Sequence, residues 1–314
     1  MNRHSQASQL VAALQNFSRD EHPLNGLSSP AHYNVLAFQI IDSIRRIRYM
    51  ATLTSRTDYM DPLRKEPNSD LFDPLRAACL HLRDNNYDEA CWLVFLATHF
   101  GRSNKTGWVL CRDIYSGLGT QTWTWDAITD DFDAFEQWFA SVSDELTLHS
   151  SLRQYGNHRK YETKKYHSRR SIPVVFRSYL GFIGATYSHE ARFAEARSFT
   201  ATPATLFELL YSGLNAVVSF GRTARFDYLT MLRKTGLIEA EPGHAFLKGA
   251  TGPLQGSRLL FSNSRSAGDR LEALNDKLAE LAEIIPAPYL RMQVIEDALC
   301  NWQKSPDRYV YFGG

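Results

Sequence analysis

The basic segment in the middle of the chain is its most informative group of chemically active residues. Residues 153–170, RQYGNHRKYETKKYHSRR, carry seven cations against one glutamate, with three tyrosines between them. The cations are Arg153, Arg159, Lys160, Lys164, Lys165, Arg169 and Arg170. Cationic side chains bind phosphate oxygens with release of counterions, and tyrosine rings can stack on unpaired bases. The segment therefore predicts contact with nucleic acid, and a solvated loop that pairs with the acidic segment before it is the alternative.

A carboxylate that follows two arginines is the first candidate for proton transfer or charge stabilisation. In SFGRTARFDYLTMLRKTGL, residues 219–237, Thr223 can cap a helix whose first turn holds Arg222, Arg225 and Asp227. A carboxylate near cations in a DNA-facing cleft is the functional interpretation. The alternative is a capping carboxylate paired with one of the arginines, and spacing alone favours it.

Two further carboxylates lie in the last expected helix, LRMQVIEDALCNWQK. Glu296 and Asp297 fall at three- and four-residue spacings from Gln293 and Cys300, on a face beside the apolar stripe. Polar groups so close to a core face are unusual for a solvated surface. They could act in a site, or they could satisfy buried helix ends nearby.

A glycine-rich turn, GATGPLQGSRLL at residues 249–260, is a second candidate phosphate site. Gly249 and Gly252 lead into a helix started by Pro253, and the free amides at such a helix start suit a phosphate. Lys248 and Thr251 belong to the same candidate site. The turn resembles the hairpin of helix-hairpin-helix DNA-binding proteins, although its glycines are one residue further apart than in that pattern. An ordinary tight turn fits equally well.

Several other chemistries are excluded by absent motifs. The sequence contains neither G-x-x-x-x-G-K-[ST] nor G-x-G-x-x-G, and position 193 is Phe, so His189 and Glu190 do not begin an H-E-x-x-H zinc site. The four cysteines form no C-x-x-C pair and are best placed in the core of a protein from a reducing compartment. We therefore expect no metal and no cofactor.

Apolar residues recur at three- and four-residue spacings in most of the chain, which predicts a mostly helical fold. One helix is marked by the apolar positions between 35 and 47, and Pro203, Pro253 and Pro288 are expected in first helical turns. The other expected helices are 90–99, ending at Gly101, 108–118, 131–148, 172–185, 203–218, 223–234, 269–284 and 288–304.

The charge is almost balanced over 314 residues, with 35 Lys plus Arg against 34 Asp plus Glu. The two signs of charge are nevertheless separated along the chain, because residues 113–152 contain no lysine or arginine and precede the basic segment. This predicts an N-terminal helical region at 1–150, a basic DNA-binding arm or linker at 151–171, and a second helical region with the hairpin at 172–314. Without an apolar leader or a membrane-crossing run, a cytoplasmic protein with no membrane partner is expected.

Three stretches resemble one known family when they are taken together. EACWLVFLATHFGRSNKTGW at 89–108, YGNHRKYE at 155–162, and the block from FGRTARFDYL through GATGPLQGSRLLF to EDALCNWQK are similar to the alpha-glutamyl/putrescinyl thymine pyrophosphorylases, or amino acid:DNA transferases. The resemblance covers about residues 30–314. The matching positions are Asn157, His158, Arg159 and Lys160, then Arg222, Arg225 and Asp227, and finally Glu296 and Cys300.

This resemblance implies a mostly α, helix-hairpin-helix DNA-glycosylase-like fold with an N-terminal helical elaboration. The chain most resembles the bacterial antiphage members of the family. The activity that this resemblance implies is excision of a hypermodified base, such as glucosylated hydroxymethylcytosine, from double-stranded phage DNA. Asp227 and Glu296 are the first catalytic candidates, with Asp297 beside them. Asp269, about seventeen residues after the hairpin glycine, is the structural competitor, and a solvated helix cap is its favoured interpretation.

Two other functions remain open at this stage. A transferase would displace pyrophosphate from an activated hydroxymethyl base and attach an amino acid or polyamine. A noncatalytic DNA-binding protein would use Asp227, Glu296 and Asp297 only as structural partners. The sequence motifs do not separate these activities.

Overall fold

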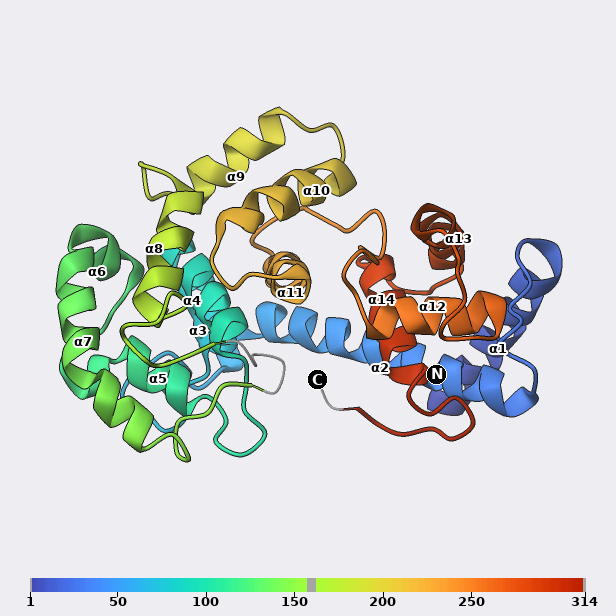
Figure 1. Cartoon of the computed structure of the whole chain (residues 1–314), viewed down its shortest axis with the longest axis horizontal. Helices are drawn as coiled ribbons and strands as arrows, with labels where there is room; N and C mark the ends of the chain where they lie inside the picture. The colour runs from blue at the N-terminus through green and yellow to red at the C-terminus, as the bar shows by residue number, and fades with distance from the viewer. Residues whose placement is uncertain (1, 157–161, 313–314) are drawn as a thin grey trace. The chain divides into compact units, whose positions relative to one another are not determined.

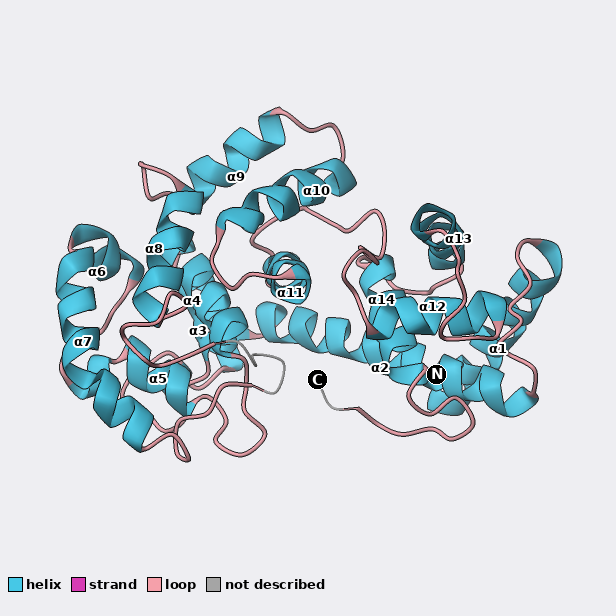
Figure 2. Ribbon diagram, viewed as in Figure 1, coloured by secondary structure: helices cyan, strands magenta, loops and turns pink. Residues whose placement is uncertain are grey.

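Helices account for the architecture of the chain, which a computed structural model describes for residues 2–156 and 162–312 (Figure 1). Within those ranges Figure 2 shows helices and loops, and the extended pairings are two isolated bridges, between Ser103 and Gly107 and between Thr163 and Ser171. The expectation of an all-helical fold is confirmed.

Most expected helices are present, with ends shifted by a few residues. The first seven α-helices are α1 (Arg3–Asp20), α2 (Pro30–Ser55), α3 (Pro74–Arg83), α4 (Tyr87–Phe100), α5 (Val109–Tyr115), α6 (Trp125–Asp130) and α7 (Phe132–Leu148). The others are α8 (Ile172–Ile183), α9 (His189–Ser198), α10 (Pro203–Gly213), α11 (Arg222–Lys234), α12 (Gly252–Ser262), α13 (Leu271–Glu283) and α14 (Arg291–Trp302). The sequence reasoning missed α1, α3, α6 and α9.

Two details of the expected helix starts are wrong. Gly221 is the N-cap of α11, so Thr223 lies inside the helix and does not cap it. Leu290, in a left-handed conformation with φ of 56°, precedes α14, so Pro288 lies in the loop before that helix. Pro203 and Pro253 do occupy first helical turns, where a proline costs no hydrogen bond.

The chain divides into two compact units. Unit 1 combines Met1–Met50 with Glu241–Gly314, and unit 2 is the continuous stretch Ala51–Ala240. The expected boundaries after residues 150 and 171 both fall inside unit 2. Residues 1–50 instead share a core with the C-terminal helices, because the apolar sides of α1 and α2 are buried against α12, α13 and α14.

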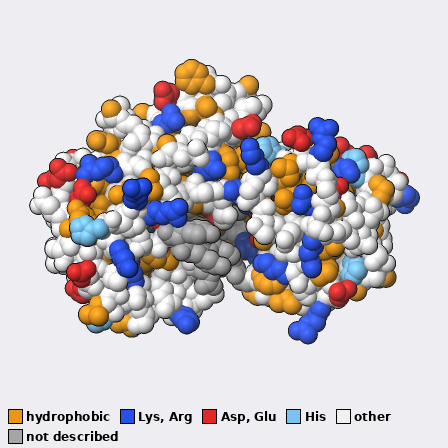
Figure 3. All heavy atoms as spheres, viewed as in Figure 1, with side chains coloured by type: hydrophobic (Ala, Val, Ile, Leu, Met, Phe, Trp, Pro, Cys, Tyr) orange, Lys and Arg blue, Asp and Glu red, His pale blue; other side chains and the backbone are white. Residues whose placement is uncertain are grey.

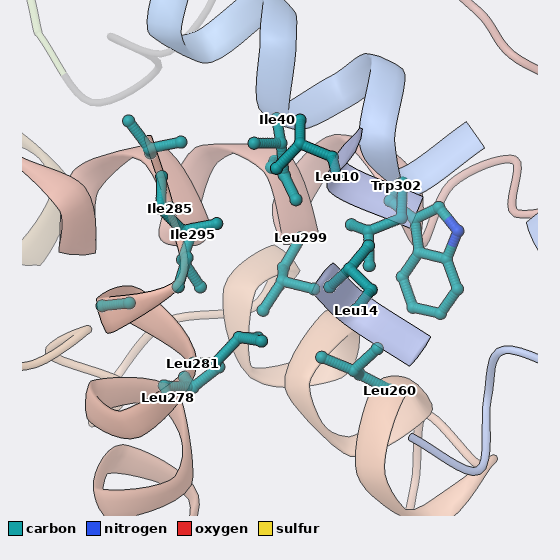
Figure 4. Packing of buried hydrophobic residues seen from close by; sticks show 14 of the residues in the cluster. Leu10, Leu14, Ile40, Leu260, Leu278, Leu281, Ile285, Ile295, Leu299 and Trp302 are labelled. Carbon is teal, nitrogen blue, oxygen red and sulfur yellow. The ribbon is translucent and has the colours of Figure 1, made fainter. Parts of the chain in front are cut away.

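The core of unit 1 is a cluster of mostly aliphatic side chains with Trp302 at one side of it (Figure 4). Leu10 and Leu14 come from α1, Ile40 comes from α2, and Leu299 comes from α14. Close backbone approaches tighten this core. A Cβ atom on Gly256 of α12 would lie 2.5 Å from the carbonyl oxygen of Leu299, so only glycine permits this contact between α12 and α14.

Unit 2 is built around α4, which is buried on all sides. Each residue from Glu89 to Phe100 is buried, as expected from its continuous apolar run, and Gly101 ends the helix with φ of 64°. Aromatic rings fill the space around α4. The rings of Phe95 and Tyr179 are stacked with centroids 3.7 Å apart, and Trp92 packs edge-on against Phe176 at 4.8 Å.

Candidate nucleic-acid interface

The basic segment is divided by the fold into exposed and buried cations. Lys165, Arg169 and Arg170 are exposed, as a phosphate-binding role requires. Lys164 is 9% exposed, and its Nζ donates a hydrogen bond to the carbonyl oxygen of Arg153 at 2.8 Å. Its burial lowers the pKa of the Lys164 ammonium. Lys164 therefore has a structural contact within the segment, and its assignment as a DNA contact stays a prediction. The expected contacts Asn157, His158, Arg159 and Lys160 lie outside the described residues.

Arg153, at the start of the segment, is an internal link. Its Nε donates to Oδ2 of Asp113 on α5 at 2.7 Å, and Oδ1 of Asp113 accepts from Nε of Arg112 at 3.1 Å. Nη2 of Arg153 also lies 3.8 Å from Oε1 of Glu145 on the preceding acidic helix, α7. The main acidic partner of Arg153 is therefore a buried carboxylate on α5, and the solvated acidic helix is secondary.

The start of the basic segment packs against the end of α4. The amide of Gly156 donates to the carbonyl oxygen of Phe100 at 2.9 Å, and a Cβ atom on Gly156 would lie 2.9 Å from the carbonyl carbon of Gly101. Tyr155 stacks on Phe100 with ring centroids 5.8 Å apart. The first two residues of the stretch 155–162 that carries the family resemblance are therefore neighbours of the end of the stretch 89–108 within unit 2.

Next to this junction lies a polar pocket of about 240 Å³. Its wall includes four arginines from separate parts of unit 2, together with two aspartates and Trp108. The charged lining residues are Arg64, Arg76, Arg102, Arg112, Asp70 and Asp73. The sequence reasoning missed this site, because its arginines are dispersed over 49 positions of the chain. The only sequence signal was Arg102, within the block at 89–108.

Asp227 lies in the second turn of α11, and the first turn contains no acidic residue. The interpretation of Asp227 as a first-turn capping carboxylate is therefore wrong. Arg225 donates to the carbonyl oxygen of Tyr211 at 3.3 Å and lies over the Tyr211 ring, 4.3 Å from its centroid. Arg222 lies 4.9 Å from the centroid of the Phe226 ring. Both arginines thus contact aromatic side chains, and Asp227 is half-buried.

The glycine turn of unit 1 has the expected local form. Gly249 has φ of 78°, which favours glycine, and α12 begins at Gly252 with Pro253 in its first turn. Lys248, Gly249 and Thr251 are exposed. Gly252 has a packing role, because a Cβ atom there would lie 2.5 Å from Sγ of Cys300 on α14.

Asp297 is held by three side chains of unit 1. Its Oδ2 accepts hydrogen bonds from Ser43 at 2.9 Å and from Arg46, and its Oδ1 accepts from Asn301 at 3.3 Å. Ser43 and Arg46 belong to α2, so this carboxylate joins α14 to α2. Glu296, one position earlier, is half-buried.

Asp269 ties together the connection between α12 and α13. Both of its carboxylate oxygens accept from the Ser262 hydroxyl, at 2.8 and 2.9 Å. The N-cap of α13 is Arg270, so Asp269 is not the cap residue expected from the sequence. Its contacts with Ser262 nevertheless give it a structural role.

Two acid groups at the start of α4, the buried Glu89 and the half-buried Asp88, were not predicted. Glu89 accepts hydrogen bonds from the Tyr115 hydroxyl at 2.5 Å and the Trp125 amide at 2.6 Å, and burial raises the pKa of its carboxyl to about 7. Asp88 lies 2.8 Å from Nδ1 of the buried His189, whose pKa is lowered by desolvation. The sequence pattern that could have revealed these two residues is a pair of adjacent acids at the start of an otherwise apolar helix.

Within the described ranges, no group of three or more histidine, cysteine, aspartate or glutamate side chains could hold a metal ion. The described helices also include none long and apolar enough to cross a membrane.

Lysine and arginine side chains are spread over both units on the face drawn in Figure 3. The near-neutral total charge is therefore compatible with local cationic surface.

These features define an all-helical protein with exposed cations and an arginine-lined pocket. A sequence model of the alpha-glutamyl/putrescinyl thymine pyrophosphorylases, clade 3, matches residues 31–314. The chain belongs to this family, whose members are pyrophosphorylase-like amino acid:DNA transferases, and the expected family resemblance is confirmed. Searches of curated proteins and of solved structures found no significant match.

Proposed function

We propose that this chain attaches an amine to activated pyrimidines in DNA. The amine nitrogen attacks the exocyclic methylene carbon of a pyrophosphorylated hydroxymethyl pyrimidine. A C–N bond forms, the C–O bond to the pyrophosphate breaks, and pyrophosphate leaves with the electron pair while a base takes the amine proton. The observation that carries this proposal is the family match over residues 31–314.

The exposed cations supply the hold on DNA in this proposal. Lys165, Arg169 and Arg170 in unit 2 and Lys248 in unit 1 are placed at the surface, where each can neutralise a backbone phosphate. Excision, the second candidate below, would need the target nucleotide flipped out of the duplex, because its glycosidic bond cannot be reached within the stack.

Two carboxylates are proposed for the proton transfer. Asp227 and Glu296 are half-buried and lie in the sequence stretches that resemble the family. A carboxylate within hydrogen-bond reach of the amine can accept its proton. Asp297, which accepts from Arg46, and Asp269, which accepts from Ser262, each join two elements of unit 1, and we propose structural roles for them.

Excision of the modified base is the second candidate. The observation that favours it is Asp227, a half-buried carboxylate in the second turn of α11, the helix that also carries Arg222 and Arg225. In that reaction the carboxylate stabilises the positive charge that develops on the deoxyribose and orients water. The product is an abasic site, as expected for an antiphage glycosylase acting on glucosylated hydroxymethylcytosine.

Two substrates separate the candidates. Full-length protein is incubated with putrescine or glutamate and DNA that carries pyrophosphorylated hydroxymethyluracil, and in parallel with DNA that carries glucosylated hydroxymethylcytosine. The transferase predicts inorganic pyrophosphate and an amine-modified nucleoside from the first DNA, measured by mass spectrometry. Free modified base and alkali-labile sites from the second DNA would replace this proposal with excision. If both DNAs are bound and returned intact, the chain is a noncatalytic DNA-binding protein.

A further inference from the structure

The arginine pocket of unit 2 is assembled from four separate backbone segments. Arg64 ends the short 3₁₀ turn η2 (Pro62–Arg64), Arg76 lies in the first turn of α3, Arg102 follows α4, and Arg112 lies on α5. Segments so far apart in sequence meet here because α3 and α5 both pack against α4.

The pocket has more positive than negative charge on its wall. Four arginines face two aspartates, and Arg102 forms no ion pair with a described carboxylate. Asp73 is already engaged as the N-cap of α3, accepting from the amides of residues 75 and 76, and lies 3.8 Å from Arg76. Like charges brought together in this way repel each other unless an anion is bound.

Arg112 pairs with two aspartates, and an anion in the pocket could replace one of them, Asp70. Its Nη1 lies 2.5 Å from Oδ1 of Asp70, whose side chain is 98% exposed. An exposed carboxylate is strongly hydrated and contributes little as an ion-pair partner. An incoming anion can therefore displace Asp70, while the buried Asp113 continues to hold the guanidinium through its Nε.

The size and the donors of the pocket select a small oxyanion. Pockets that hold drug-sized ligands are roughly 300–1,000 Å³ in volume, and this pocket, at about 240 Å³, is smaller. Guanidinium groups are forked donors that match phosphate oxygens in pairs.

We infer that this pocket binds inorganic pyrophosphate, the leaving group of the proposed transferase. The identity of the anion rests on the proposed function, whereas the existence of an anion site rests on the four arginines. The pocket is connected to the basic segment through contacts on two sides. The Gln154 amide donates to the Thr106 hydroxyl at 3.4 Å, and Asp113 bridges Arg112 to Arg153.

Calorimetric titration of the full-length protein with inorganic pyrophosphate, without DNA or amine, tests the site. One saturable site is expected. Arg102→Gln and Arg76→Gln should each weaken binding about tenfold, because each removes charge-assisted hydrogen bonds. Asp70→Asn should tighten binding several-fold by removing the competing carboxylate. Arg177→Gln, which alters an exposed arginine paired with Asp133 and Glu136 on α7, is the matched control and should leave binding unchanged.

The competing sources of phosphate are separated by competition. Pyrophosphate should bind more tightly than inorganic phosphate, and a short single-stranded DNA should not displace it. If DNA displaces pyrophosphate from the wild type but not from Arg102→Gln, the pocket binds a backbone phosphodiester. That result would overturn the inference. Equal binding by all variants, or no saturable binding, would also overturn it. Thermal unfolding of each variant shows whether it is folded.

The two proposals can fail independently. If pyrophosphate binds as expected but no amine is transferred to DNA, the transferase fails and the anion site stands. If amine transfer occurs and the arginine variants bind pyrophosphate as the wild type does, the pocket inference fails and the transferase stands.

Discussion

A Cβ atom on Gly252 would lie 2.5 Å from Sγ of Cys300, so the glycine turn and the last helix are fitted to each other within unit 1. Gly252 and Gly256 are one helical turn apart and both face α14. The residues that made this segment look like a phosphate-binding turn therefore also set the distance between two core helices.

Alanine at these two glycines should destabilise unit 1 to different extents. Gly256→Ala should cost roughly 1–3 kcal/mol of unfolding free energy, because the added methyl meets the Leu299 backbone. Gly252→Ala should cost less, because the Cys300 side chain can move, and Cys300→Ala should reduce that cost further. Urea unfolding of the single and double variants measures both effects. Equal costs at the two glycines would contradict this account of the packing.

Substitution of Asp227 or Glu296 should remove the catalytic activity without changing DNA binding. Asp227→Asn and Glu296→Gln should each abolish turnover while DNA affinity stays unchanged, because an amide cannot accept the proton or stabilise a cation as a carboxylate does. Turnover and DNA binding are measured on the same preparations. Normal turnover in both variants would rule out this catalytic assignment.

Asp297→Asn should behave differently from these two variants. It removes the charge that pairs with Arg46, so the main expected loss is about 1 kcal/mol of stability. Thermal unfolding shows that loss, and Arg46→Gln should cause a similar one. Complete loss of turnover in a fully stable Asp297→Asn protein would instead make Asp297 a catalytic residue.

The exposed cations of the basic segment should determine how DNA binding depends on salt. Lys165→Gln and Arg169→Gln should each weaken DNA binding and reduce the slope of log K against log salt by about 1, because each removes one phosphate contact. Titrations at several salt concentrations measure the slope, with Arg177→Gln as the control. An unchanged slope in both variants would show that these two residues do not contact phosphate.

Glu89 should make unit 2 less stable as the pH rises towards neutrality. Burial raises its carboxyl pKa from 4.5 to about 7, so the folded state binds a proton more tightly than the unfolded state. The stabilisation is fully present below about pH 4.5 and is lost as the pH rises through about 7, a change on the order of 3 kcal/mol. Glu89→Gln should remove this component when unfolding is measured from pH 4.5 to 8. Parallel wild-type and variant curves would contradict it.

Local sequence determined much of the helical architecture. The spacing of apolar residues was sufficient for α4, α7 and α11, and the continuous apolar run of α4 indicated that it is buried on all sides. Short or polar helices such as α6 and α9 were missed, because few of their residues are buried and their periodicity is weak.

The exposed positions of Lys165, Arg169 and Arg170 followed from the sequence, since a charged segment without apolar periodicity remains at the surface. The burial of Lys164 did not, because it depends on a carbonyl oxygen that the fold brings within hydrogen-bond distance. Only the tertiary structure joined residues 1–50 to the C-terminal helices and placed four dispersed arginines around one pocket. The physical reason is that periodicity reports which face of a helix is buried, whereas the partner of that face is decided by packing between segments distant in sequence.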